Sequence, residues 1–210
     1  MLQDRITSIF FFLLKTGLWK DSNGESNLFP LTNREWNEIF KTSIAQTVEC
    51  LIFDGIQKLK VENQPPKALL LNWAVRVEKH AQRNEVMNAT ILNLHSLFEV
   101  EHNIPMTLLK GQGIAKCYDN PLRRICGDID LFFKNKSDYN QAFSIINKRG
   151  LEINPMAGFS AEYKFDGFEV EHHEKMIDIH NPFVFKTLNK IRKDEENKST
   201  FLNISSSSIR

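Results

Sequence analysis

Apolar residues recur every three or four positions through the first hundred residues, which is the spacing of the buried face of an amphipathic helix. Three segments show this spacing: residues 6–19, the segment that follows Thr32, and residues 67–102. Glu35 follows Thr32 three positions later, which is the pattern of a capping box and predicts a helix start. The sequence "ENQPP" at residues 62–66 predicts the break before the last helix.

From residue 103 onward the pattern changes to short apolar runs separated by turn residues. Such runs at residues 103–111 and 127–133 predict strands. Alternating residues at 162–173 flank Asp166 and Gly167, and this dipeptide predicts a tight hairpin turn between two strands.

Two short helices and one more strand are expected in the same region. The sequence "QGIAKCYDN" (112–120) predicts the first helix, and Ser137 and Gly150 are the expected N-cap and end of the second. Residues 175–183, "KMIDIHNPF", predict another strand. We therefore expect an α+β fold, in which a helical N-terminal region precedes a small mixed β-sheet flanked by helices.

The same change in pattern predicts the domain organisation. Residues 1–103 are expected to form a helical N-terminal region, and residues 104–185 a small α/β core. Residues 186–210 are polar and rich in charge, which is typical of a solvated tail.

Composition narrows the class of protein only slightly. The net charge is +1, so a nucleic-acid partner is possible but not indicated. Cys50, Cys117 and Cys126 are odd in number and form no CxxC pair, which favours a reducing, cytoplasmic setting over a disulfide framework. The apolar run at residues 9–14 falls far short of the roughly 20 residues of a membrane span, so no membrane partner is expected.

Two aspartates stand in the predicted strand "GDIDLFF". Asp128 and Asp130 share one face of this strand, and Ile129 and Leu131 point to the other. Two charges about 6 Å apart repel by about 3 kcal/mol at an effective dielectric constant of about 20. Open water, an arginine or a divalent cation could offset this repulsion, and exposed acids on an edge strand are an equally ordinary explanation.

A third acid is expected on the strand at residues 175–183. There Asp178 and His180 share one face. If this strand lies beside the one with Asp128 and Asp130, three carboxylates gather on one surface and suit Mg²⁺ or Mn²⁺. Two such ions could clamp a triphosphate. His180 is equally compatible with a structural role, and His172 and His173, which face opposite ways, are interpreted as structural.

The segment "LLKGQGIAK" predicts a strand, a glycine-containing turn and a helix. Gly111 and Gly113 would let the backbone approach a phosphate, and Lys110 and Lys116 add positive charge. The spacing is not that of a Walker loop, and an ordinary turn has the same pattern.

Together these residues resemble the uncharacterised nucleotidyltransferase family of the DNA polymerase β-like nucleotidyltransferase superfamily. The resemblance is carried by Lys110-Gly111, Tyr118, Pro121, Arg124, Gly127-Asp128-Ile129-Asp130-Leu131, and the later Asp178 and His180. The wider superfamily has Gly-Ser where this chain has Lys110-Gly111, so a serine hydroxyl is missing from the turn. Members usually continue into a further helical segment, of which residues 186–210 would be a truncated form.

The resemblance implies transfer of a nucleoside monophosphate from a nucleoside triphosphate to an acceptor hydroxyl on a small molecule, RNA or protein. Asp128 and Asp130 would hold both of two Mg²⁺ or Mn²⁺ ions, and Asp178 would hold the ion that activates the acceptor. His180 would contact the acceptor or support a metal ligand.

The resemblance also assigns the nucleotide contacts. Lys110, Gly111, Gly113 and Gly127 would bind the nucleotide, and Arg124 would either neutralise phosphate charge or pair with an aspartate. Two alternatives stay open: an Asp-x-Asp glycosyltransferase that uses a sugar nucleotide, and a non-catalytic protein that binds a nucleotide or a partner.

Overall fold

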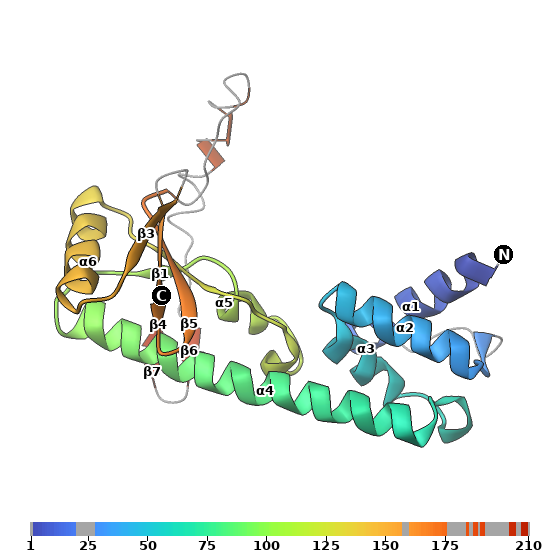
Figure 1. Cartoon of the computed structure of the whole chain (residues 1–210). Helices are drawn as coiled ribbons and strands as arrows, with labels where there is room; N and C mark the ends of the chain where they lie inside the picture. Colours follow the sequence, from blue (N-terminus) through green and yellow to red (C-terminus); the bar gives the residue numbers. More distant parts are fainter. Residues whose placement is uncertain are drawn as a thin grey trace. The chain divides into compact units, whose positions relative to one another are not determined.

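The computed structural model describes residues 2–19, 28–156 and 160–175, with shorter pieces at 184, 187–188, 190–191, 202–204 and 207–209 (Figure 1). They form two compact units. The first holds the described residues up to Glu85 together with Cys117–Ile125, and the second holds Val86–Lys116 and the described residues from Cys126 onward. The domain boundaries expected from the sequence stay a prediction.

The first unit is helical, as the sequence predicts. Its elements are α1 (Leu2–Trp19), α2 (Asn33–Ala45), α3 (Glu49–Ile56), η2 (Val61–Asn63), the first part of α4 (Lys67–His95) and η4 (Pro121–Arg123). The capping box that starts α2 is confirmed. The backbone N–H of Glu35 donates to Oγ1 of Thr32 at 3.3 Å, and Oε2 of Glu35 accepts from the backbone N–H of Thr32 at 2.7 Å.

Two helices differ in extent from the sequence prediction. The segment after Thr32 forms α2 and α3 instead of one helix, because the helix is interrupted by a turn at Thr47, whose φ is +54°. The helix expected to reach residue 102 is α-helical only to His95 and continues as the π-helical turn η3 (Ser96–Val100).

Helices α1 and α3 cross at two glycines. A Cβ atom on Gly17 would overlap the backbone carbonyl of Leu51, and one on Gly55 would overlap the carbonyl of Leu13. The two backbones therefore approach more closely than any side chain allows. Around the crossing lies the core of this unit, with Ile9, Leu13, Trp36, Ile39, Cys50, Ile52, Ile56 and Trp73 fully or almost fully buried.

The second unit is built on a five-stranded mixed sheet in the order β1-β2-β5-β4-β3. The strands are β1 (Thr107–Leu108), β2 (Ile129–Phe132), β3 (Ile153–Met156), β4 (Ser160–Phe165) and β5 (Phe168–His173). Strands β2 and β5 run parallel, and the other neighbours run antiparallel. The predicted α+β fold class is therefore confirmed.

Helices cover the sheet and complete its core. Helix α5 (Gln112–Ala115) follows β1, and α6 (Lys136–Lys148) follows β2. Residues from the end of α4, from η3, from α6 and from the sheet share one apolar cluster, which includes Ile91, Leu94, Phe98, Ile129, Leu131, Ala142, Ile146 and Val170. Two short strands, β6 (Leu202–Ile204) and β7 (Ser207–Ile209), pair with each other, and Leu202 and Ile204 reach the same cluster.

Turn and cap predictions in this unit have mixed outcomes. The hairpin is confirmed: Asp166 and Gly167, with φ of +47° and +84°, connect β4 to β5. The N-cap of α6 is Asn135, so the prediction of Ser137 is wrong by two residues. The strand expected at residues 175–183 lies almost entirely outside the described residues.

None of the helices in the part of the chain that the structure describes combines the length and the apolar character that a membrane span needs.

Candidate functional site

The site lies where the turn after β1 passes the start of β2. The backbone N–H of Leu109 donates to the carbonyl of Asp130 at 3.1 Å, which fixes the next residue, Lys110, beside the aspartates. Gly111 has φ +61° and ψ −121°, a conformation that side chains disfavour, and a Cβ there would lie 3.5 Å from the carbonyl oxygen of Asp128. The glycine is therefore needed for the backbone conformation of the turn, since a Cβ at that distance would be in ordinary contact.

A lysine offsets the repulsion between the two aspartates. Nζ of Lys110 lies 3.3 Å from Oδ2 of Asp128 and 3.2 Å from Oδ1 of Asp130. Partial burial acts to lower the pKa of Lys110, but hydrogen bonds and charge from Asp130 and Asp128 outweigh it, so the pKa is raised. The ammonium stays protonated, and the chain thus supplies its own cation to the acid pair.

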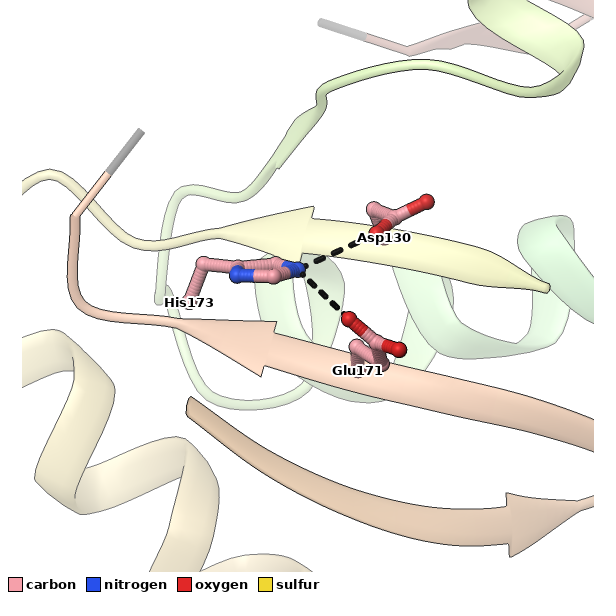
Figure 2. A group of neighbouring side chains, drawn as sticks. All are labelled: Asp130, Glu171 and His173. Carbon is pink, nitrogen blue, oxygen red and sulfur yellow. Dashed lines mark hydrogen bonds and ion pairs between the residues drawn. The ribbon is translucent and has the colours of Figure 1, made fainter. Parts of the chain in front are cut away.

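The parallel pairing of β2 with β5 brings two more polar side chains to Asp130. Asp130 pairs with Glu171, and Phe132 pairs with His173, so both polar residues of β5 share the face of Asp130. Nε2 of His173 lies 3.1 Å from Oδ1 of Asp130 and 3.2 Å from Oε2 of Glu171 (Figure 2). Each of the three residues offers one ligand atom, and these atoms all lie within 4.8 Å of one another.

Asp130 is charged despite its burial. Its side chain is only 1% exposed, and burial acts to raise its pKa, but hydrogen bonds from His173 and Lys110 outweigh burial and lower the pKa. These two partners both contact Oδ1, whereas Oδ2 is buried without a hydrogen-bond partner. The carboxylate therefore keeps one oxygen for a further ligand.

The pKa of Glu171 is shifted in the opposite direction to that of Asp130. Burial, followed by the negative charge of Asp130, raises the pKa of Glu171. Its side chain is 22% exposed, and that of His173 is 21% exposed, so solvent reaches both. A cation placed between Asp130 and Glu171 would relieve their mutual repulsion.

The adjacent His172 has a different role. It is 1% exposed, and Nε2 of its ring lies 2.6 Å from the hydroxyl oxygen of Tyr163. Burial, followed by the charge of His173, lowers the pKa of His172 to about 3. It is therefore a neutral core residue, as the sequence suggests, whereas His173 on the opposite face lies in the site.

The structure gathers some of the predicted site residues and not others. Asp128, Asp130, Lys110 and Gly111 lie together. Two further predicted residues, Asp178 and His180, lie outside the described residues.

Among the remaining predicted nucleotide contacts, Gly113 lies in α5 and Gly127 precedes β2. A Cβ on Gly113 would lie 3.6 Å from the carbonyl of Leu108, and one on Gly127 would meet open space. Arg124 belongs to the first unit, and its carbonyl accepts a hydrogen bond from Asn84 at 2.7 Å.

Glu171 and His173 are the polar residues that the sequence did not assign to the site. The sequence does indicate that these two residues share one face of a strand, because Phe168, Val170 and His172 alternate with them along β5. Their contact with Asp130 depends on the pairing of β5 with β2, which joins segments about forty residues apart.

This donor set fits a divalent metal ion. Carboxylate oxygens suit Mg²⁺ and Mn²⁺, and an imidazole nitrogen suits transition metals. The buried oxygen of Asp130 without a partner is the feature that a bound cation would satisfy.

A family model described as uncharacterised nucleotidyltransferase matches residues 32–205 of the chain. The match includes Lys110, Asp128, Asp130, Glu171 and His173. No curated protein and no solved structure matches the chain.

Proposed function

Since the chain belongs to the uncharacterised nucleotidyltransferase family, we propose that it transfers a nucleoside monophosphate from a nucleoside triphosphate to an acceptor hydroxyl, using divalent metal ions. The observation that carries this proposal is the position of Lys110, between Asp128 and Asp130 and next to the turn at Gly111. Acids for a metal ion, a cation for phosphate and a close backbone approach then lie within one small region.

Asp128 and Asp130 would hold Mg²⁺ or Mn²⁺, with two ions as the expected number. When bound, such an ion supplies positive charge to the triphosphate and orients it for in-line displacement. The side chain of Lys110 is 50% exposed and four methylenes long, so it can turn from the aspartates to a phosphate oxygen. Gly111, Gly113 and Gly127 would leave room for the phosphates.

In the proposed reaction, the acceptor oxygen bonds to the α-phosphorus, the bond from this phosphorus to the bridging oxygen breaks, and pyrophosphate leaves. The proton of the acceptor hydroxyl would pass to Asp178, the role that the family resemblance implies, and His180 would contact the acceptor or support a metal ligand. The acceptor is a small molecule, an RNA or a protein, and the reducing cytoplasm is the proposed setting.

The family match favours this activity over the Asp-x-Asp glycosyltransferase alternative. Calorimetry separates an active site from a protein that binds no nucleotide. The wild type in Mg²⁺ is titrated with ATP, GTP, CTP and UTP, and we expect at least one triphosphate to bind. Asp128→Asn should abolish this binding, and Asp138→Asn, the same change on α6, should not. Absence of binding by all four triphosphates to the wild type would overturn the proposal.

A further inference from the structure

We propose that Asp130, Glu171 and His173 form a divalent-cation site of mixed oxygen and nitrogen ligands, and that this site binds Mn²⁺ in preference to Mg²⁺ before any nucleotide is present. The inference rests on the proposed function in that its site shares Asp130 with the two aspartates proposed to hold the catalytic ions. Binding of the metal alone tests it separately.

The three ligands stand on two paired strands in the interior of the sheet. Strand β2 lies between β1 and β5, and β5 lies between β2 and β4, so neither is an edge. The register places Asp130 opposite Glu171, and the carbonyl of His173 accepts a hydrogen bond from the N–H of Phe133 at 3.2 Å. Ligands on rigid, paired strands keep their spacing, which a metal site needs.

The three side chains converge on one another. Nε2 of His173 lies 3.1 Å from Asp130 and 3.2 Å from Glu171, and Figure 2 shows the ring directed between the two carboxylates. The imidazole thus contacts both acids through one nitrogen. A cation at this position would bind both carboxylates directly and accept the imidazole nitrogen as its third protein ligand.

The buried oxygen of Asp130 is the independent sign of a missing ligand. Its Oδ2 is buried and without a hydrogen-bond partner, while the side chain as a whole is 1% exposed. A buried acceptor without a partner costs about 1–3 kcal/mol. A cation bound through both oxygens of Asp130 would satisfy Oδ2, which neither Lys110 nor His173 contacts.

The nitrogen ligand decides the choice of metal. Mg²⁺ prefers oxygen ligands and retains several of its waters, whereas Mn²⁺ accepts carboxylate oxygens and, as a first-row transition metal, an imidazole nitrogen as well. Solvent reaches Glu171 and His173, whose side chains are about one-fifth exposed, so an ion can enter and keep water ligands. The site should therefore select Mn²⁺ over Mg²⁺, and His173 should be the residue responsible.

The test measures Mn²⁺ binding to the full chain without nucleotide, by the loss of the free-ion electron paramagnetic resonance signal. Glu171→Gln and His173→Gln should each weaken Mn²⁺ binding at least roughly tenfold, the lower end of the loss seen when a partner of a metal ligand is removed. Glu169→Gln is the matched control, since Glu169 is an exposed glutamate on the same strand and outside the cluster. It should leave Mn²⁺ binding unchanged.

Competition with Mg²⁺ tests the selectivity. Mg²⁺ should displace Mn²⁺ from the wild type only at a large excess, and His173→Gln should reduce that excess. Unchanged Mn²⁺ affinity in both cluster variants, or an equal loss in Glu169→Gln, would overturn the inference. Melting temperatures without metal show whether each variant folds. A folded cluster variant whose melting temperature rises with Mn²⁺ as much as that of the wild type would also contradict the inference.

The outcome is separable from that of the proposed function. If Mn²⁺ binding depends on Glu171 and His173 but no triphosphate binds, the metal site stands and the nucleotidyltransferase activity falls. If triphosphate binds but neither cluster variant changes Mn²⁺ affinity, the proposed function stands and the metal site at Glu171 and His173 is refuted.

Discussion

Nζ of Lys110 lies 3.2 Å from Oδ1 of Asp130, so the chain places its own positive charge on the acid that would hold a metal ion. The same ammonium lies 3.3 Å from Oδ2 of Asp128. These contacts of Lys110 stabilise the acid pair. A metal ion would compete with it, and the phosphates of a nucleotide would attract it.

Replacement of Lys110 by Met should therefore move two affinities in opposite directions. Mn²⁺ alone should bind more tightly, by about tenfold or ~1.4 kcal/mol, because no ammonium competes for the aspartates. The triphosphate in Mg²⁺ should bind more weakly, because a phosphate loses its cation. Calorimetry with each ligand measures both changes.

The exposed Lys164 on β4 provides the matched control, and Lys164→Met should leave both affinities unchanged. A shift of both affinities in the same direction in Lys110→Met would contradict the competition.

Replacement of Asp128 and replacement of Asp130 should lower the free energy of unfolding by different amounts. Asp128 is 32% exposed, and its contact with Lys110 is a surface ion pair, so Asp128→Asn should cost less than about 1 kcal/mol of unfolding free energy. Asp130 is buried and bonded to His173, so Asp130→Asn should cost about 1–3 kcal/mol. Urea unfolding measures both values, and equal losses would count against this account of Asp130.

The crossing of α1 and α3 predicts an effect of two glycine substitutions on the stability of the first unit. Gly17→Ala and Gly55→Ala should each cost about 1–3 kcal/mol, because the new methyl group meets backbone carbonyls that cannot move independently. Thermal melting detects the loss. Gly127→Ala is the control, because a Cβ there meets nothing within 4 Å. A neutral result at both helix glycines would show that the crossing is looser than described.

The ion pair of Glu49 with Arg76 predicts that the stability of the protein depends on pH. Oε2 of Glu49 accepts from Nε of Arg76 at 2.6 Å, and Oε1 lies 2.7 Å from Nε2 of His80. Burial acts to raise the pKa of Glu49, but these partners outweigh it and lower the pKa below the usual value of 4.5. The carboxylate thus contributes stability above about pH 4.5 and loses it as the pH falls through the lowered pKa.

Glu49→Gln should therefore destabilise the protein at pH 7 by about 1–2 kcal/mol, a modest value because Arg76 is 38% exposed. Urea unfolding between pH 7 and pH 3.5 should show the difference from the wild type shrinking below about pH 4.5. Glu62→Gln, a change of an exposed glutamate, should show no such trend. A constant difference over the whole range would refute the assigned ion pair.

Local signals in the sequence predicted local structure well. The capping box at Thr32 and the turn at Asp166 and Gly167 depend on residues within a few positions of one another, and both are confirmed. The break at Thr47 was not predictable, because a β-branched residue at φ +54° contradicts its own propensity and is held there by the fold.

The site was predictable only in part, because some of its residues are neighbours along the chain and others are brought together only by the fold. Lys110, Asp128 and Asp130 stand on consecutive elements, and the motif links them in sequence. Glu171 and His173 reach the site because β5 pairs parallel to β2. Such non-local pairing is a property of the whole sheet, and no residue near Glu171 or His173 indicates it.

Transfer of label from the α-phosphate tests the central claim most directly. The wild type is incubated with a cell extract, Mg²⁺ and triphosphates labelled at either the α or the γ position, with Asp128→Asn as the inactive control. Nucleotidyl transfer predicts that α label becomes attached to an acceptor and γ label is released as pyrophosphate, with neither change in the control. Attachment of γ label to the acceptor, or no transfer of α label from any of the four triphosphates, would contradict it.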